Sequence, residues 1–134
     1  MIKNRLIIAI ILILTVIVLA GCEAAGPAGY NARIGPEHAM EIMANNPYSI
    51  ILDVRTLEEF NEGHIPNAVS LPVDEIEAAI TRMIPDKGEI ILVYCRSGRR
   101  SADAAVILVE MGYRNVFDFG GIIDWTGEVI TPSH

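Results

Sequence analysis

Two short, continuous apolar runs constrain the fold of this chain more than any other feature of its sequence. They are Tyr48–Val54 (YSIILDV) and Glu89–Tyr94 (EIILVY), and neither shows the regular polar–apolar alternation of a strand with one face in water. Such runs are typical of strands that are buried on both faces of a parallel sheet. The sequence therefore predicts a sheet with helices packed on each side of it.

Helical patterns separate these two strands and follow them. Pro36 suits the first turn of a helix that ends before Pro47, and both Asp74–Met83 and Ala102–Met111 have helical spacing. An α/β fold is expected, with a mainly parallel sheet of about five strands, helices on both faces and sites beyond the carboxyl ends of the strands. The shorter predicted elements are strands at Ala68–Leu71 and Asn115–Phe119, a helix behind the capping box Thr56-x-x-Glu59, and a last helix around Asp124-Trp125.

The first part of the chain has the composition of an export signal. Lys3 and Arg5 precede an apolar stretch, Leu6–Ala20, which is shorter than the roughly 20 residues that span a bilayer. The stretch ends in Leu19-Ala20-Gly21-Cys22, which resembles the lipobox of bacterial lipoproteins. This resemblance implies a lipoprotein signal peptide over residues 1–21 and a lipid such as palmitate on Cys22. An uncleaved signal anchor is the alternative, and both forms attach the protein to the extracytoplasmic side of the cell membrane.

Residues 22–31 begin at the lipidated Cys22 and continue as EAAGPAGYN, with short side chains and no apolar periodicity. This composition predicts a flexible tether between the membrane and the fold. The folded domain is then expected over residues 32–134.

The charge of the chain limits its partners. Ten basic residues against 17 acidic ones give a formal net charge of −7. Nucleic acid is excluded as a partner because phosphate binding needs a basic surface, and attachment to the membrane is left to the lipid. Against this acidic background, the arginines that follow Cys95 form a local basic cluster, which favours a small anionic ligand.

Cysteine usage singles out Cys95. The chain has two cysteines, so lipidation of Cys22 leaves Cys95 without a disulfide partner inside the domain. A metal site is not expected, because His38, His64 and His134 are scattered and no second thiolate is available. An unpaired exported cysteine at the end of a buried strand is therefore a candidate nucleophile.

The residues after Cys95 can stabilise a thiolate. Gly98 permits a tight bend, and the amides of the loop and the start of the next helix can face an anion at the same place. Together with the positive charges of the arginines, these groups lower the pKa of a thiol and favour its reactive, exposed thiolate. Arg100 closes the loop and is the better candidate for holding a charged group of a substrate. The predicted substrate-binding residues are Arg96, Ser97, Gly98, Arg99 and Arg100.

Several separate motifs follow one another along the chain: Asp53-Val54-Arg55 with Glu59-Phe60, Gly63-His64-Ile65-Pro66-Asn67-Ala68, Leu71-Pro72, Val93–Ala102, Gly112-Tyr113, and Gly120-Gly121 with Trp125. Together they resemble a single rhodanese domain over about Ile34 to Glu128. The resemblance implies the rhodanese-like form of the α/β fold and a thiosulfate sulfurtransferase-like enzyme that needs no organic cofactor. It also implies that the counterpart of Cys95 takes a sulfane sulfur atom as a persulfide from a small anionic donor such as thiosulfate and passes it to cyanide or a thiol.

Other residues in these motifs have supporting or structural interpretations. Asp53 and Arg55 resemble the family's strand-end pair, and they either brace the active loop by charge-assisted hydrogen bonds or serve the fold alone. His64 is predicted to be a hydrogen-bonded structural residue and Trp125 a core residue.

Three alternatives stay beside the sulfurtransferase. A cysteine phosphatase or arsenate reductase needs five residues between cysteine and arginine, and position 101 is Ser101 rather than arginine. A membrane-tethered module could relay sulfur to, or bind, a partner protein with little turnover of its own. A redox sensor is disfavoured because the domain has no second cysteine to resolve an oxidised one.

Overall fold

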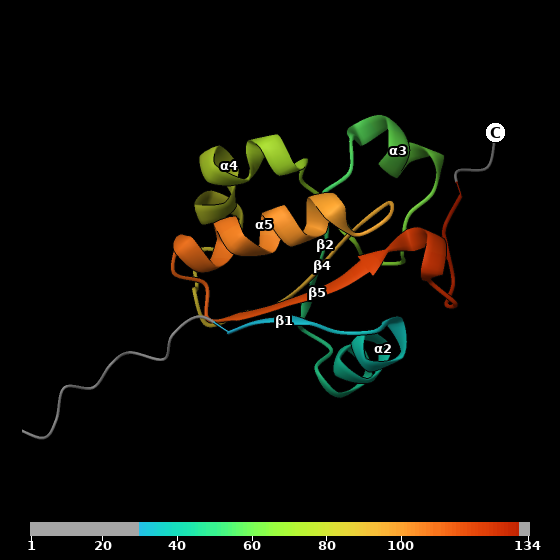
Figure 1. The fold of residues 1–134 in the computed structure, drawn as a ribbon, viewed down its shortest axis with the longest axis horizontal. Coiled ribbons are helices and arrows are strands. Elements are labelled where there is room, and N and C mark those ends of the chain that lie inside the picture. The colour runs from blue at the N-terminus through green and yellow to red at the C-terminus, as the bar shows by residue number, and fades with distance from the viewer. Residues whose placement is uncertain (1–29, 132–134) are drawn as a thin grey trace, which may run out of the picture.

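The computed structural model describes residues 30–131 (Figure 1). The predicted signal peptide, Cys22 and most of the predicted tether lie outside the described residues. Within residues 30–131, none of the helices has the length and apolar character needed to cross a membrane.

A five-stranded sheet forms the centre of the domain, with the strand order β1-β5-β4-β2-β3. Every pairing in this sheet is parallel, as the apolar runs predicted. The two predicted runs become β2 and β4, which lie next to each other. The strands are β1 (Tyr30–Arg33), β2 (Ile50–Asp53), β3 (Val69–Ser70), β4 (Ile90–Cys95) and β5 (Asn115–Gly121).

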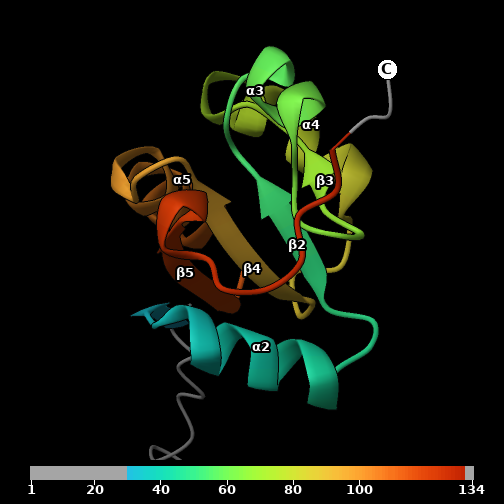
Figure 2. The same cartoon turned by 90° about the vertical axis from the view of Figure 1, so that its right-hand side faces the viewer.

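Helices cover both faces of the sheet, so the predicted α/β fold is confirmed (Figures 1 and 2). On one face, α2 (Pro36–Asn45) packs through Ala39 against buried side chains of β4 and β5. On the other face, α4 (Ile76–Met83) and α5 (Arg99–Glu110) bury side chains such as Ile80 and Leu108 in the larger of the two cores. A short helix, α3 (Leu57–Glu62), lies near the carboxyl ends of the strands (Figure 1).

Some element boundaries differ from the prediction. The strand β1 begins at Tyr30, so the fold starts before the predicted boundary at residue 32 and includes the end of the predicted tether. The physical reason is that β1 is an edge strand, and main-chain pairing with β5 holds it without an apolar pattern. Tyr48 is not part of the strand that follows it: it is 89% exposed, and β2 begins only at Ile50.

Two predicted helices are partly 3₁₀ turns. The segment before α4 forms a 3₁₀ helix, η1 (Val73–Glu75), because Pro72 sets its entry and the Glu75 amide donates to the Pro72 carbonyl. The last predicted helix is also a 3₁₀ turn, η2 (Ile122–Asp124). By contrast, α5 starts earlier than predicted, at Arg99, so the arginines of the predicted site lie in its first turn and in the loop before it.

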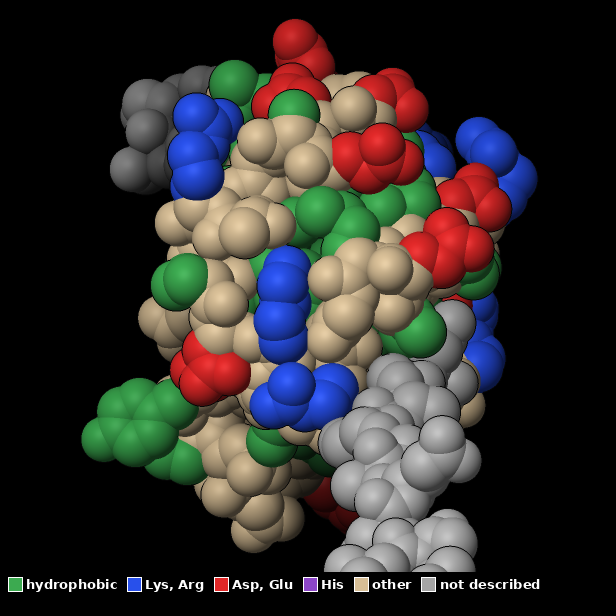
Figure 3. Space-filling view, turned by 90° about the vertical axis from the view of Figure 1, so that its left-hand side faces the viewer, with side chains coloured by type: hydrophobic (Ala, Val, Ile, Leu, Met, Phe, Trp, Pro, Cys, Tyr) green, Lys and Arg blue, Asp and Glu red, His purple; other side chains and the backbone are tan. Residues whose placement is uncertain are grey.

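The carboxyl ends of the strands and the start of α5 lie at one end of the domain, and the strands begin at the other (Figure 1). On the surface around the beginnings of the strands, basic side chains lie among acidic and apolar ones (Figure 3). That face therefore offers no extended basic surface.

Candidate active site

Cys95 is the last residue of β4, and the chain turns at once into α5. Gly98 makes this turn possible, since its φ of 99° lies in the left-handed region that favours glycine. A register shift between β4 and β5 at Val93/Tyr94 pairs Cys95 with Gly121. At Gly121 a Cβ atom would collide with the main chain of Arg96, so this glycine lets β5 approach the loop closely. The structure therefore confirms the predicted tight loop between Cys95, at the carboxyl end of β4, and the start of α5.

Main-chain groups surround the Cys95 sulfur. The Gly98 amide donates a hydrogen bond to Sγ at 3.0 Å, and the Ser101 hydroxyl lies 3.7 Å from Sγ. Burial raises the pKa of the Cys95 thiol, but the Ser101 amide and hydroxyl and the amides of Gly98 and Ser97 lower it by more. The net effect is a lowered pKa, so this environment favours the thiolate.

The predicted exposure of Cys95 is wrong, because the residue is only 1% exposed. The cause is the left-handed turn at Gly98, which folds the loop back over the end of β4 and brings the Gly98 amide onto the sulfur. The sulfur is covered by polar main-chain groups on the side of the loop, although Cys95 also borders the larger apolar core. Burial strengthens these hydrogen bonds because little water competes for them.

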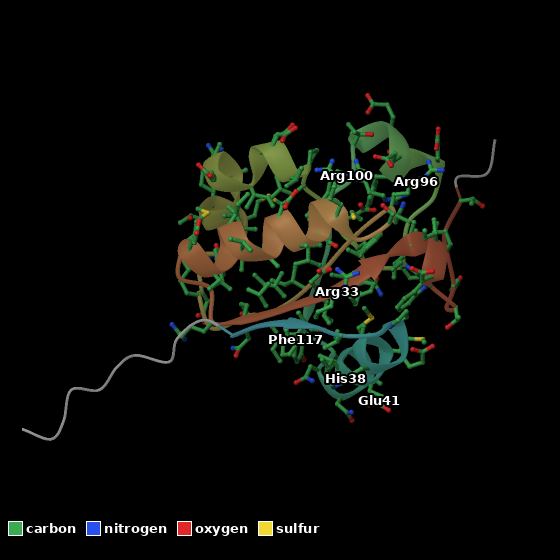
Figure 4. All side chains as sticks on the ribbon, viewed as in Figure 1. Arg33, His38, Glu41, Arg96, Arg100 and Phe117 are labelled. Atoms are coloured by element: carbon green, nitrogen blue, oxygen red, sulfur yellow. The ribbon has the colours of Figure 1, made fainter. Side chains whose placement is uncertain are left out.

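The three predicted arginines behave differently from one another. Arg99 is highly exposed, with its guanidinium 3.6 Å from the carboxylate of Asp103. Arg96 is exposed as well, and its carbonyl accepts a hydrogen bond from the amide of Ile123. Figure 4 shows Arg96 and Arg100 near the start of α5. The largest contributions that lower the Cys95 pKa come from amides and the Ser101 hydroxyl, not from guanidiniums.

Arg100 is held by Glu59, which the sequence did not predict as a partner of Arg100. The two side chains form a bidentate pair with N–O distances of 2.7 and 2.9 Å. The hydrogen bond from Arg100 holds the pKa of Glu59 down at about 2, below its ordinary value of 4.5. Glu59 also completes the predicted capping box with Thr56, which is confirmed. An anion that binds Arg100 must therefore compete with the Glu59 carboxylate.

Asp53 and Arg55 form a buried ion pair at 2.6 Å at the carboxyl end of β2. The Arg55 guanidinium also donates to the Gly63 carbonyl at 2.7 Å and lies 5.6 Å above the ring centre of Tyr94, the residue before Cys95. The pair thus braces the segment after α3 and the end of β4.

His64 has the structural role that was predicted, whereas Trp125, predicted as a core residue, is only partly buried. His64 stacks on the ring of Phe60 at 3.8 Å, and its Nδ1 lies 2.9 Å from the Phe60 carbonyl. Trp125 packs against the core on the α2 face of the sheet, next to Phe119.

Three contributors to the site were missed in the sequence: Arg33, Ser101 and Asp118. Ser101 is fully buried and lies next to the sulfur, while Arg33 and Asp118 form an ion pair at 2.6 Å beside the loop. An acidic residue inside a predicted buried strand is a signal that Asp118 needs a cation, but nothing local points to Arg33 as that cation.

A groove of about 680 Å³ lies beside the start of α5. Arg99 and Arg100 form part of its wall, so it adjoins the loop without including Cys95. Within residues 30–131, no three His, Cys, Asp or Glu side chains come together as a metal site would require. The other residues that line the groove are Val73, Asp74, Glu77, Ala78, Asp103 and Ile107.

Comparison with known proteins identifies relatives of this domain. The family model described as "Rhodanese-like domain" matches residues 36–128. Thiosulfate sulfurtransferase PspE of Escherichia coli strain K12 is 40% identical over 73 residues, which are 54% of this chain and 70% of that protein. A sulfurtransferase of Allochromatium vinosum is 34% identical over 94 residues, 69% of this chain and 86% of that protein. Adenylyltransferase and sulfurtransferase UBA4 of Candida albicans is 36% identical, but this chain spans only 24% of its length.

Solved structures give the same result. A structure described as "rhodanese with anions from E. coli" is 34% identical, covers 63% of this chain and 99% of its own, and has a TM-score of 0.59. A rhodanese-like domain protein from Staphylococcus aureus is 30% identical, covers 75% of this chain and 98% of its own, and has a TM-score of 0.64.

Proposed function

Because this chain belongs to the rhodanese-like domain family, we propose that it is a sulfurtransferase in which Cys95 accepts a sulfane sulfur atom and passes it on. The two relatives named as sulfurtransferases that it matches over most of their length support this proposal. The observation that carries it is the environment of the Cys95 sulfur, which accepts the Gly98 amide at 3.0 Å and has a lowered pKa.

The first half-reaction loads sulfur onto the protein. The Cys95 thiolate attacks the outer sulfur of thiosulfate, a new S–S bond forms to Cys95, and the old S–S bond breaks. Sulfite leaves with the electron pair of the broken bond, and the negative charge of the persulfide resides on its terminal sulfur. The charge is therefore the same before and after the step, and no oxidant or reductant is consumed.

The second half-reaction unloads the sulfur. Cyanide or a thiolate attacks the terminal sulfur of the persulfide, the S–S bond breaks, and its electron pair returns to Cys95 as the thiolate. The amides that face the Cys95 sulfur stabilise the anion in both states of the protein. Neither step requires a metal ion or an organic cofactor.

The arginines act on the donor. Arg96 and Arg99 are exposed, so they attract an anionic donor to the loop through their charge. Arg100 is the candidate for direct contact with the sulfonate of thiosulfate, in competition with Glu59. Because Cys95 is only 1% exposed and its sulfur lies under the loop, the donor makes its first contacts with the loop residues.

Two measurements on the domain test this function. The first is thiocyanate formation from thiosulfate and cyanide, with Cys95→Ser as the inactive control. The second is the mass of the protein after incubation with thiosulfate, which should rise by about 32 Da, the mass of one sulfur atom, and return to its original value with cyanide. An active Cys95→Ser variant would refute the role of Cys95. A persulfide that forms but turns over only with a partner protein would favour the relay module instead.

We also propose that the protein is attached to the cell membrane through a lipid on Cys22. The apolar stretch followed by the lipobox-like Leu19-Ala20-Gly21-Cys22 supports this proposal. Incorporation of labelled palmitate into the full chain, compared with a Cys22→Ala variant, tests it. Equal labelling of the two proteins, or a retained N-terminal methionine, would refute the lipidated form.

A further inference from the structure

Arg33 reaches the active loop from the opposite end of the sequence. It is the last residue of β1 and lies across from Asp118 of β5 in the register of the sheet. One nitrogen of its guanidinium, Nη1, donates to the Asp118 carboxylate at 2.6 Å and to the Gly98 carbonyl at 3.3 Å. Figure 4 shows Arg33 between β1 and the start of α5. The edge strand is thus linked to the residue whose amide contacts the Cys95 sulfur.

Two glycines make room for this guanidinium. A Cβ atom on Gly98 would lie 2.5 Å from Arg33 Nη2, and one on Gly120 would lie 3.0 Å from the same atom. Asp118 uses its second oxygen to accept the Gly120 amide at 3.0 Å. The Arg33–Asp118 pair therefore links β1 to the active loop through the Gly98 carbonyl, and to the end of β5 through the Gly120 amide.

The Gly98 carbonyl is within reach of three donors: the Ser101 hydroxyl, the Arg33 guanidinium and the Ala102 amide. A hydroxyl has a single proton to donate, and Ser101 Oγ lies 3.2 Å from the Gly98 carbonyl, 3.3 Å from the Gly120 carbonyl and 3.7 Å from the Cys95 sulfur. When Cys95 is a thiolate, the hydroxyl can turn its proton toward the sulfur. The Gly98 carbonyl then still has Arg33 and the Ala102 amide as donors, so this buried acceptor stays paired.

We propose that Arg33 is a positioning residue for Cys95. Its guanidinium holds the Gly98 carbonyl, so that the Gly98 amide stays directed at the sulfur and the Ser101 hydroxyl is free to donate to the thiolate. This inference deepens the proposed sulfurtransferase function and rests on it for its purpose. Asp118, which is only 4% exposed, holds the guanidinium in place.

The charged groups around the loop determine which variants are informative. Arg99 is paired with Asp103, Arg100 with Glu59, Arg55 with Asp53, and Arg33 with Asp118. Removal of Arg33 alone would leave a buried carboxylate near Cys95, and that carboxylate would disfavour the thiolate by its charge. The double variant Arg33→Met/Asp118→Asn removes both charges and keeps an acceptor for the Gly120 amide. It therefore separates loss of positioning from an unpaired carboxylate.

The experiment measures the rate of Cys95 alkylation by iodoacetamide between pH 5 and pH 10 (about the range over which a thiol titrates). The proteins are the unmodified chain, Arg33→Met, the double variant, and Arg82→Met as control. Arg82 is an exposed arginine of α4, so its variant loses the same charge far from the loop. The midpoint of the rate profile should rise by about one pH unit in the double variant, because the Gly98 amide no longer stays directed at the thiolate and its hydrogen bond is lost. The midpoint should stay unchanged in Arg82→Met.

A midpoint in the double variant equal to that of the unmodified chain would overturn the proposal. A midpoint that rises in Arg33→Met but not in the double variant would overturn it as well, because the unpaired Asp118 carboxylate would then be the cause of the rise. Circular dichroism checks that each variant is folded, and the double variant remains informative if Arg33→Met does not fold. Alkylation requires no sulfur transfer, so failure of the proposed enzyme activity would be seen separately in the thiocyanate assay.

Discussion

The Ser101→Ala substitution tests the central physical claim about Cys95. Ser101 is fully buried, and its hydroxyl is among the groups that lower the pKa of the thiol. Alanine keeps the Ser101 amide, which also lowers this pKa, and removes only the hydroxyl. The substitution should therefore raise the pKa of Cys95 without removing its main-chain partners.

The size of the effect follows from the contact. A hydrogen bond to a charged group contributes about 1.5–3 kcal/mol, and the 3.7 Å distance to sulfur favours the lower end of that range. Since one pH unit corresponds to about 1.4 kcal/mol, the pKa should rise by about one unit. On the limb of the profile below the midpoint, the alkylation rate should then fall about tenfold, while the plateau at high pH stays the same.

Iodoacetamide alkylation as a function of pH measures this shift, and Ser70→Ala is a matched control. Ser70 of β3 is half-buried, and its hydroxyl oxygen is buried without a hydrogen-bond partner within residues 30–131. Its replacement should leave the Cys95 profile unchanged and cost no stability, because no hydrogen bond is lost. An unchanged midpoint in Ser101→Ala would show that the hydroxyl does not face the thiolate. A lower plateau at high pH would mean that the loop itself had moved.

Three further predictions concern the surroundings of the loop. Gly98→Ala should cost about 1–2 kcal/mol of stability and lower the reactivity of Cys95. Gly112 has a similar φ of 94° but open space around it, so Gly112→Ala should cost stability alone, and equal Cys95 reactivity in both variants would contradict the role of Gly98. Glu59→Gln should be less stable than the unmodified chain by about 1 kcal/mol above pH 4.5, and because the pKa of Glu59 is lowered to about 2, this difference should vanish as the pH falls through that value. Chemical denaturation at several pH values measures the difference, and a difference that does not change with pH would argue against the Arg100 pair. Tyr113→Phe should lower the free energy of unfolding in urea by about 1–2 kcal/mol, because the buried Ile84 carbonyl loses its hydrogen bond from the tyrosine hydroxyl. An unchanged free energy of unfolding would mean that water replaces the hydroxyl.

The sequence was sufficient for those features that depend on local patterns. The runs that became β2 and β4 were visible because strands buried on both faces leave no polar alternation. The capping box at Thr56 was visible for a similar reason, since it involves residues three positions apart. The position of Cys95 at the end of β4 followed from the strand alone.

The remaining features depend on contacts between distant residues. Glu59 and Arg100 are 41 positions apart, and Arg33 and Asp118 are 85 apart, so no local spacing indicates either pair. The edge strand β1 was assigned to the tether because main-chain pairing leaves no mark on composition. The burial of Cys95 also escaped prediction, because it depends on the register shift in β4 and the left-handed turn at Gly98.

Burial and reactivity make opposite demands on Cys95, and the loop meets both with main-chain amides. Desolvation alone would keep the thiol protonated, and free guanidiniums at this depth would add desolvation costs of their own. Amides carry no net charge, so they can be buried against the sulfur at lower cost and still stabilise an anion. The same amides can stabilise a negative terminal sulfur one bond further out. Under the proposed function, the amides then stabilise both the thiolate and the persulfide, the two states between which sulfur moves onto Cys95 and off it again.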